Sequence, residues 1–132
     1  MKKLFAVVLF VMLSVSSICN AFTLDKERWV KVAENEKDEA YVDVITLTYI
    51  RNSIYDKANV WVCFFDKVNK TYMVSDNVFD FNENTTQGKQ IICYDENGEL
   101  LTQLSRETKP ERTVPGSMGE GIFLVVKNHR PE

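Results

Sequence analysis

The segment NVWVCFFDK, residues 59–67, is the stretch that decides the fold. Its central residues, Val60 to Phe65, are all apolar, so both faces of a strand formed here would carry apolar side chains. A short continuous apolar run of this kind is typical of a strand buried on both sides. We therefore predict that residues 59–67 form a central strand of a sheet.

Segments on both sides of this strand also have the composition of strands. RWVKVA alternates apolar and polar residues, whereas EAYVDVITLTYI is rich in β-branched and aromatic residues. Asn97 and Gly98 lie between two apolar runs and form the strongest short hairpin signal in the chain. Because turns separate the segments, we expect an antiparallel sheet of about six strands. The predicted strands lie at residues 28–33, 39–50, 59–67, 71–81, 90–95 and 99–105.

The stretch TVPGSMGEGIFLVV, residues 113–126, decides which element comes after the sheet. Ser117 and Glu120 have the spacing of a capping box, in which each side chain accepts an amide proton at a helix start. Against a helix, Gly119 and Gly121 weaken a first turn, and IFLVV also suits a strand. We predict a short helix after Ser117, with a final strand as the alternative. The expected fold class is α+β, an antiparallel sheet of about six strands with a short C-terminal α-helix packed on one face.

Residues 1–21 have the pattern of a secretory signal peptide. Two lysines precede an unbroken apolar run, residues 4–13, and small side chains precede the predicted cleavage site after Ala21. The apolar run is shorter than the roughly 20 residues that a membrane-spanning helix needs. Cleavage would leave residues 22–132, whose length suits one small domain.

The three cysteines bear on the compartment. Cys19 follows Ile18 rather than the small residue that precedes a lipidated cysteine, so a lipid anchor at Cys19 is not expected. Exported domains of this size commonly carry a disulfide, which predicts a bridge between Cys63 and Cys93. Such a bridge would stabilise the domain by roughly 3 to 4 kcal/mol on a chain-entropy model. Two buried free thiols are the alternative.

No group of residues has the pattern of an active site. Ser117 has Gly119 two positions after it, but Pro115 stands where the nucleophile elbow requires its first glycine. His129 is the single histidine, and one histidine does not make a metal site. We therefore predict no catalytic residue, no metal and no cofactor, and a protein that is not an enzyme.

Charge and patterning restrict the partners. The net charge is −3, and loss of two lysines with the signal peptide makes the remaining domain more acidic. Nucleic-acid binding needs clustered Lys and Arg, so nucleic acid is not an expected partner. No segment after residue 21 has the apolar length of a transmembrane helix. Strand edges can pair with a partner chain or with a second copy, so a homodimer is an open alternative.

Several short motifs appear along the chain in a distinctive order. WVKV (29–32) comes after the signal peptide, YVD (41–43) comes next, and VWV (60–62) lies in the central strand. A strand with Cys93 and the sequence VPGSMGE (114–120) complete the series. Over most of residues 22–132 this order resembles the bacterial surface-adhesin protein E family.

The resemblance implies an antiparallel sheet crossed by a C-terminal helix, and exposure on the envelope of a Gram-negative-type bacterium. The founding member of that family is a lipoprotein that binds host proteins such as laminin and vitronectin. Members usually tie the helix to the sheet through a cysteine near the C-terminus. Residues 128–132 contain no cysteine, which leaves Cys63 as the partner of Cys93.

The resemblance and the residues together indicate an exported, non-enzymatic binding domain in the periplasm or on the outer cell surface. Its expected partner is a protein, such as a host extracellular-matrix or plasma protein. One alternative is a soluble periplasmic protein of structural, stress-response or carrier type without a host ligand. A small periplasmic hydrolase is the other alternative.

Overall fold

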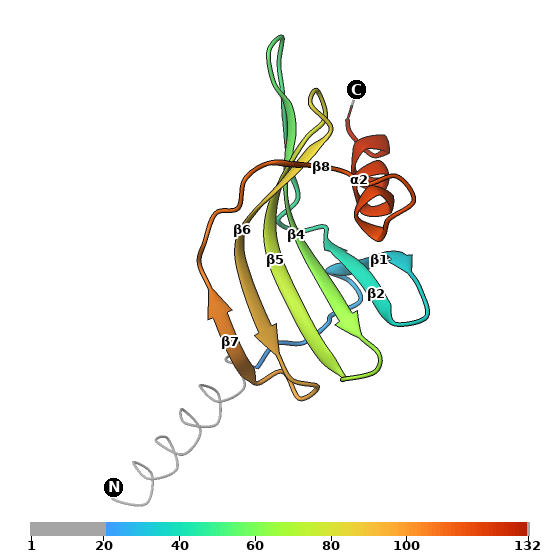
Figure 1. Ribbon diagram of the computed structural model, residues 1–132, viewed down its shortest axis with the longest axis vertical. Helices are drawn as coiled ribbons and strands as arrows, with labels where there is room; N and C mark the ends of the chain where they lie inside the picture. Colours follow the sequence, from blue (N-terminus) through green and yellow to red (C-terminus); the bar gives the residue numbers. More distant parts are fainter. Residues whose placement is uncertain (1–20, 132) are drawn as a thin grey trace, which may run out of the picture.

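The computed structural model describes residues 21–131, which form an antiparallel sheet with one helix packed against it (Figure 1). The predicted signal peptide, apart from Ala21, and Cys19 lie outside the described residues. The predicted fold class is confirmed. The elements are β1 (Trp29–Glu34), β2 (Asp38–Asp43), β3 (Thr48–Arg51), β4 (Asp56–Asp66), β5 (Thr71–Asp80), β6 (Thr85–Tyr94), β7 (Leu100–Leu104), β8 (Glu111–Arg112) and the helix α2 (Met118–Asn128).

The sheet consists of a main path of six strands and two short additional strands. The order of the main path is β1-β2-β4-β5-β6-β7, and every pair is antiparallel. β3 pairs with the first part of β4, and β8 pairs with the start of β6. The prediction of about six strands therefore matches the main path, and the sequence pattern did not predict β8 as a separate strand.

β4 is the central strand that residues 59–67 predict, although it begins earlier, at Asp56. Val60 and Val62 are 0% and 2% exposed and belong to the core on the helix side. Cys63 is 0% exposed and belongs to the core on the opposite side. Since successive side chains of a strand point to opposite faces, β4 is apolar on both, and both faces of the sheet have to be covered here.

The helix α2 covers the first of these faces. Ile122, Phe123 and Val126 are each 2% exposed, and they lie on one side of the helix. The Phe123 ring lies 5.5 Å from the Phe79 ring and 5.3 Å from the Phe81 ring, measured between centroids. The segment IFLVV thus packs with helical period, and the alternative of a final strand is wrong.

The N-terminal segment covers the opposite face. Trp29 and Val74 are buried there, and Phe22 stacks on Tyr94 with ring centroids 4.8 Å apart. The backbone N–H of Phe22 donates to the carbonyl of Gly98 at 2.9 Å. The first residues of the predicted domain are therefore part of its second core.

Gly98 is needed for this contact as well as for its own turn. Its φ is +81°, a conformation that favours glycine, in the hairpin turn between β6 and β7 that Asn97 and Gly98 predict. A Cβ atom at this position would overlap the backbone carbonyl oxygen of Phe22. Any side chain here would push the N-terminal segment away from the sheet.

Asp43 divides the segment that the sequence pattern predicts as one strand, residues 39–50. β2 ends at Asp43, and the chain turns before β3 begins. The Asp43 carboxylate accepts hydrogen bonds from Arg28 Nε at 3.0 Å and Nη2 at 2.8 Å. It also accepts the Ile45 N–H at 3.1 Å and the Thr46 hydroxyl. Burial alone would raise the pKa of Asp43, but these hydrogen bonds hold the pKa below its ordinary value.

The segment between β7 and α2, residues 105–117, crosses the sheet and is called the crossing segment (Figure 1). The sequence predicts a polar loop here, whereas the structure places β8 within it. The Thr108 N–H donates to the Gly88 carbonyl at 2.8 Å, and the Gly88 N–H donates to Thr108 Oγ1 at 3.0 Å. β8 then pairs with Thr85 and Thr86. The crossing segment is therefore fixed along β6 at two places.

Ser117 is the N-cap of α2, and its Oγ accepts the Glu120 N–H at 3.1 Å. The Glu120 carboxylate accepts the N–H of Gly116 at 3.1 Å, one residue before the position that a standard capping box uses. Both side chains thus bind backbone amides at the helix start. A serine cap of this kind typically stabilises a protein by about 1 kcal/mol.

The C-terminal end of α2 is held by polar contacts instead of a disulfide. Arg130 pairs with Asp56, and its guanidinium lies over the Phe81 ring at 5.0 Å from the centroid. The Tyr49 hydroxyl donates to the Val126 carbonyl at 2.8 Å. These contacts dock the helix end on β3 and β4 without the covalent tether that the family resemblance implies.

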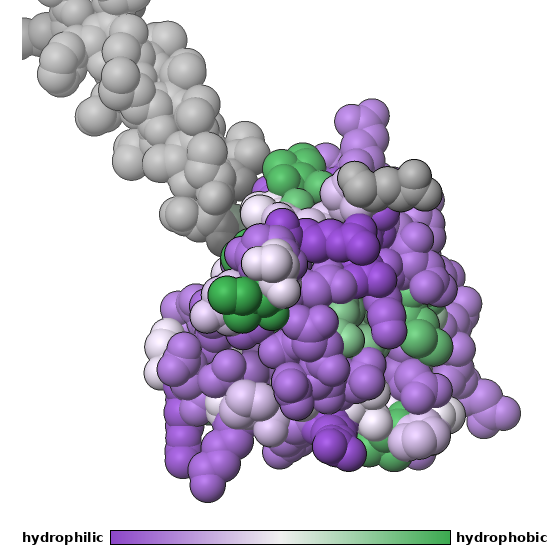
Figure 2. All heavy atoms as spheres, turned by 90° about the horizontal axis from the view of Figure 1, so that it is seen from above, coloured by the Kyte–Doolittle hydropathy of each residue, from purple (hydrophilic) through white to green (hydrophobic). Residues whose placement is uncertain are grey.

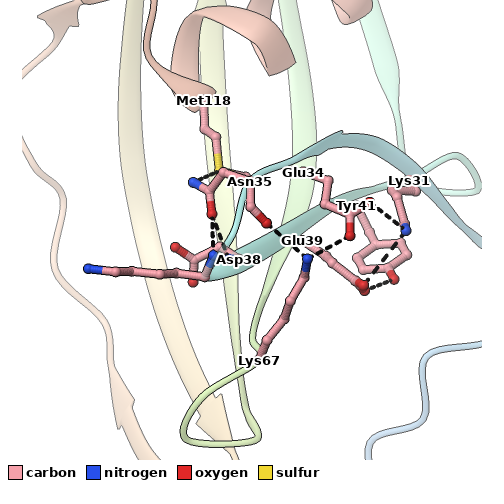
Figure 3. A network of polar contacts seen from close by, with 9 residues as sticks. Lys31, Glu34, Asn35, Asp38, Glu39, Tyr41, Lys67 and Met118 are labelled. Carbon is pink, nitrogen blue, oxygen red and sulfur yellow. Dashed lines mark hydrogen bonds and ion pairs between the residues drawn. The ribbon is translucent and has the colours of Figure 1, made fainter.

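A polar network joins the β1–β2 hairpin to the β4–β5 turn and to the helix start (Figure 3). Lys67 Nζ donates to Glu34 Oε1 at 2.6 Å and to the Asn35 carbonyl at 2.9 Å. The Asn35 side-chain amide donates to the sulfur of Met118 at 2.8 Å. Ion pairs this exposed add little to stability, so the network orients the hairpin against the helix.

We expect Phe123→Ala to lower the free energy of unfolding by about 3 to 5 kcal/mol, because it empties the space between two phenylalanine rings. Leu124 is the matched control, since it is the next residue on α2 and is 44% exposed. Leu124→Ala should change stability much less. Urea denaturation of both variants measures the difference, and equal losses would contradict the docking of α2 through Phe123.

Candidate binding surfaces

The two edges of the sheet differ in how well they are protected against pairing. β1 carries charged side chains at Lys31 and Glu34, and its register shifts between Lys31 and Ala33. Charges and bulges are two common ways in which proteins block an edge strand. The α2 helix also lies beside this edge, and a Cβ atom added at Gly121 would lie 4.0 Å from the Ala33 Cβ. The β1 edge is therefore a poor place for another strand.

The β7 edge also contains a bulge, at Leu101, but its composition differs from that of β1. Its sequence, LLTQL, is uncharged, and all five residues are exposed. Leu100, Leu101 and Leu104 are 57%, 56% and 55% exposed. β7 is the last strand of the main path, so its outer backbone has no partner strand within residues 21–131. An uncharged, leucine-rich edge is a surface that tends to pair with another strand.

Several other exposed apolar residues lie outside the strands, among them Val44 and Ile45 after β2 and Ile54 and Tyr55 before β4. Figure 2 shows the molecule from above, where small apolar groups are separated by a largely hydrophilic surface. Single apolar residues on a surface are common and need no ligand to explain them. The three leucines of β7 are distinct because they lie close together on an unpaired edge.

A hollow of 360 Å³ lies on the helix side of the sheet, beneath the crossing segment, and is called the β8 hollow. β4, β5 and β6 form its floor, the crossing segment forms one wall, and the first turns of α2 form another. Ser75 and Asn77 of β5 bring polar groups to the floor. The sequence pattern did not single out either residue, because their meeting with residues 108–114 depends on the path of the crossing segment.

A second hollow, of 410 Å³, lies on the opposite face beside Phe22 and Trp61. Its charged residues include Arg28 and Asp43. The Asp43 carboxylate is 1% exposed and receives four hydrogen bonds, so this pair is committed to holding the chain turn. The pair is thereby a structural element of the fold.

Among residues 21–131, Asp76 is the carboxylate whose pKa is raised by burial, with Lys89 acting in the opposite direction. It lies on β5, and its cross-strand partners are Trp61 on β4 and Gln90 on β6. Neither partner is a second carboxylate or a base. Acid–base catalysis usually needs such a second group, so the surroundings of Asp76 do not assemble a catalytic pair.

The predicted disulfide between Cys63 and Cys93 is wrong, because both thiols are free. Cys63 lies on β4 and Cys93 on β6, with β5 between them. The register pairs Cys63 with Val74 and Cys93 with Met73, which places the two thiols on opposite faces of the sheet. A disulfide needs Cα atoms within about 7 Å and side chains that point together. The cysteines therefore give no support to export.

The other residues considered from sequence have structural partners. Ser117 Oγ donates to the Val114 carbonyl at 2.7 Å and caps the helix. His129 Nδ1 lies 2.7 Å from the Val125 carbonyl at the end of α2. The structure does not bring Ser117 and His129 together, since they lie at opposite ends of the helix.

We expect the two thiols to differ in reactivity. Burial raises the pKa of Cys63 to about 12 and removes it from solvent, whereas Cys93 is partly exposed. Iodoacetamide at about pH 8, near the ordinary pKa of a thiol, should therefore modify Cys93 in the folded protein and Cys63 only after unfolding. Mass spectrometry of protein beginning at Phe22 measures this order. Unfolded, unreduced protein that takes up no label would show that a disulfide exists.

Within residues 21–131, none of the helices is long and apolar enough to cross a membrane. No family model matches the chain, and neither a curated protein nor a solved structure matches it.

Proposed function

We propose that the chain is an exported, non-enzymatic binding domain of the bacterial envelope, and that it binds a protein partner along the β7 edge. The observation that carries this proposal is the exposed, uncharged β7 strand at the end of the sheet. Its partner would contribute an extended segment that adds a strand to the sheet. Main-chain hydrogen bonds would supply affinity, and the leucines would supply apolar contact.

The contrast between the two edges supports this site. β1 has charges and a neighbouring helix, whereas β7 has neither charges nor a covering element within the described residues. β7 itself contains a bulge at Leu101, because Cys93 pairs with Thr102 and Tyr94 with Leu100, so the strand is bent. A bent edge still offers its backbone groups on the outer side, and it selects a partner segment that has the same bend.

The export part of the proposal rests on the signal-peptide pattern of residues 1–21 and on the resemblance to the surface-adhesin protein E family. If the domain reaches the cell surface, a host extracellular-matrix or plasma protein is the partner class that the resemblance favours. If it stays in the periplasm, it is a soluble protein without a host ligand. The two alternatives differ in where the domain is found.

Protease treatment of intact cells of the native host distinguishes these locations. We expect peptides of the domain to be released while the outer membrane stays sealed, and the mature N-terminus to be Phe22. A periplasmic marker protein that remains uncut is the control. Full protection of the domain with a Phe22 terminus would contradict surface exposure but not export, and a retained Met1 would contradict export.

Photo-crosslinking tests the β7 edge in the same cells. A photoreactive phenylalanine analogue in place of Leu101 should give an adduct of discrete mass, because this residue lies on the proposed interface. The matched control is Ile45, an aliphatic residue that is 68% exposed and lies in a turn distant in sequence from β7. We also expect Leu104→Lys to abolish the adduct by placing a charge on the edge.

The mass of the adduct identifies the partner class. An adduct heavier than the chain by the mass of another protein supports the proposal. Twice the mass of the chain would instead show a homodimer, and equal yields from the Leu101 and Ile45 sites would contradict a specific β7 interface.

A further inference from the structure

The β8 hollow carries an inference that goes beyond the proposed function, because it lies on the helix-covered face and not on the outer edge of β7. Its volume of 360 Å³ is at the small end of the range of about 300 to 1,000 Å³ that is usual for ligand pockets.

The wall of the hollow is held in place by contacts that a loose loop would lack. Thr108 makes reciprocal hydrogen bonds with Gly88, and its carbonyl accepts the Gln87 side-chain amide at 2.9 Å. β8 adds a short ladder to the start of β6. The hollow is therefore a preformed feature of the fold, bounded by the crossing segment and by α2.

The floor presents two polar groups whose orientation can be assigned. The Asn77 side-chain amide donates from Nδ2 to the Ser75 carbonyl at 3.1 Å and to Ser75 Oγ at 2.9 Å. A carbonyl oxygen can only accept, so the Asn77 nitrogen must be the atom that faces Ser75. Asn77 Oδ1 then points toward Gly88, where the absence of a side chain leaves room.

These two residues leave one donor and one acceptor unused within the described part of the chain. Ser75 is 8% exposed, and its Oγ accepts from Asn77 while its own proton has no acceptor among residues 21–131. Asn77 Oδ1 receives no hydrogen bond from these residues. Ser75 is buried and Asn77 is partly exposed on the floor of the hollow, so a ligand that fills the hollow would meet both groups.

Apolar and charged groups narrow the class of ligand further. Phe64, Phe79 and Ile122 supply apolar surface around the polar floor. At the exposed rim, Glu111 and Arg112 bring one charge of each sign, so the hollow does not select a charged ligand. The combination fits a neutral molecule with an amide group and an apolar substituent.

We infer that the β8 hollow binds a short, extended apolar peptide segment through the backbone N–H and C=O of one of its residues, which point to the same side of the segment. The carbonyl of that residue accepts the Ser75 hydroxyl proton, and its N–H donates to Asn77 Oδ1. A neighbouring aliphatic or aromatic side chain fills the apolar part of the hollow. Backbone recognition of this kind favours apolar side chains without a strict sequence.

The test uses N-acetyl-leucyl-leucinamide as the probe and monitors amide NMR signals of protein beginning at Phe22. We expect saturable shifts at Ser75, Asn77, Gly88 and Thr108. Ser75→Ala should weaken binding about three- to tenfold, the loss expected for one neutral hydrogen bond. Ser53→Ala, in an exposed turn, is the matched control and should leave binding unchanged.

A second variant keeps the test informative if Ser75→Ala disturbs the sheet. Val114 is 65% exposed at the rim of the hollow, so Val114→Trp should block entry while the fold persists. A 4-methylpentanol probe, which has the apolar group but no amide, should bind about tenfold more weakly because it lacks the peptide hydrogen bonds. Equal binding of the two probes, or unchanged binding in Val114→Trp, would overturn the inference whatever partner β7 has.

Discussion

The burial of β4 on both faces is the constraint on which the rest of the structure depends. Val60 and Val62 face one way and Cys63 the other, and all three are nearly without solvent exposure. Each face therefore needs its own cover. The helix α2 covers one face through Phe123, and the N-terminal segment covers the other through Phe22 and the neighbouring aromatic rings. A sheet without either cover would leave a wide apolar surface in water.

Local signals in the sequence predict the elements whose causes are local. The apolar run of β4, the hairpin turn at Asn97 and Gly98, and the helix start at Ser117 each depend on residues close together in the chain. The break after β2 has both local and distant causes, because Asp43 binds Ile45 and Thr46 in its own turn and also Arg28, 15 residues away. β8 has two residues, too few for a periodic pattern, and forms because the crossing segment passes beside β6.

The candidate surfaces can also be divided into features with local causes and features that depend on residues distant in sequence. That residues 100–104 form a strand could be predicted, but their place at a bare edge depends on the order of all six main strands. The β8 hollow depends on β5 and the crossing segment, which are distant in sequence, so Ser75 and Asn77 carry no local signal. The disulfide prediction failed for a related reason. Two cysteines in the same domain suggest a bridge, but strand order and register place them two strands apart on opposite faces.

The contact between Phe22 and Gly98 also constrains the order in which the domain can form. Phe22 is the first residue of the predicted mature domain, yet its hydrogen-bond acceptor belongs to the turn between β6 and β7. The chain is synthesised from its N-terminus, so Phe22 has no acceptor for its N–H until most of the sheet has been made. Contacts between residues so far apart in sequence form late and slow the folding of the domain. The segment around Phe22 is thus among the last parts to fold. The face of the sheet that it covers stays exposed to water until the sheet is nearly complete.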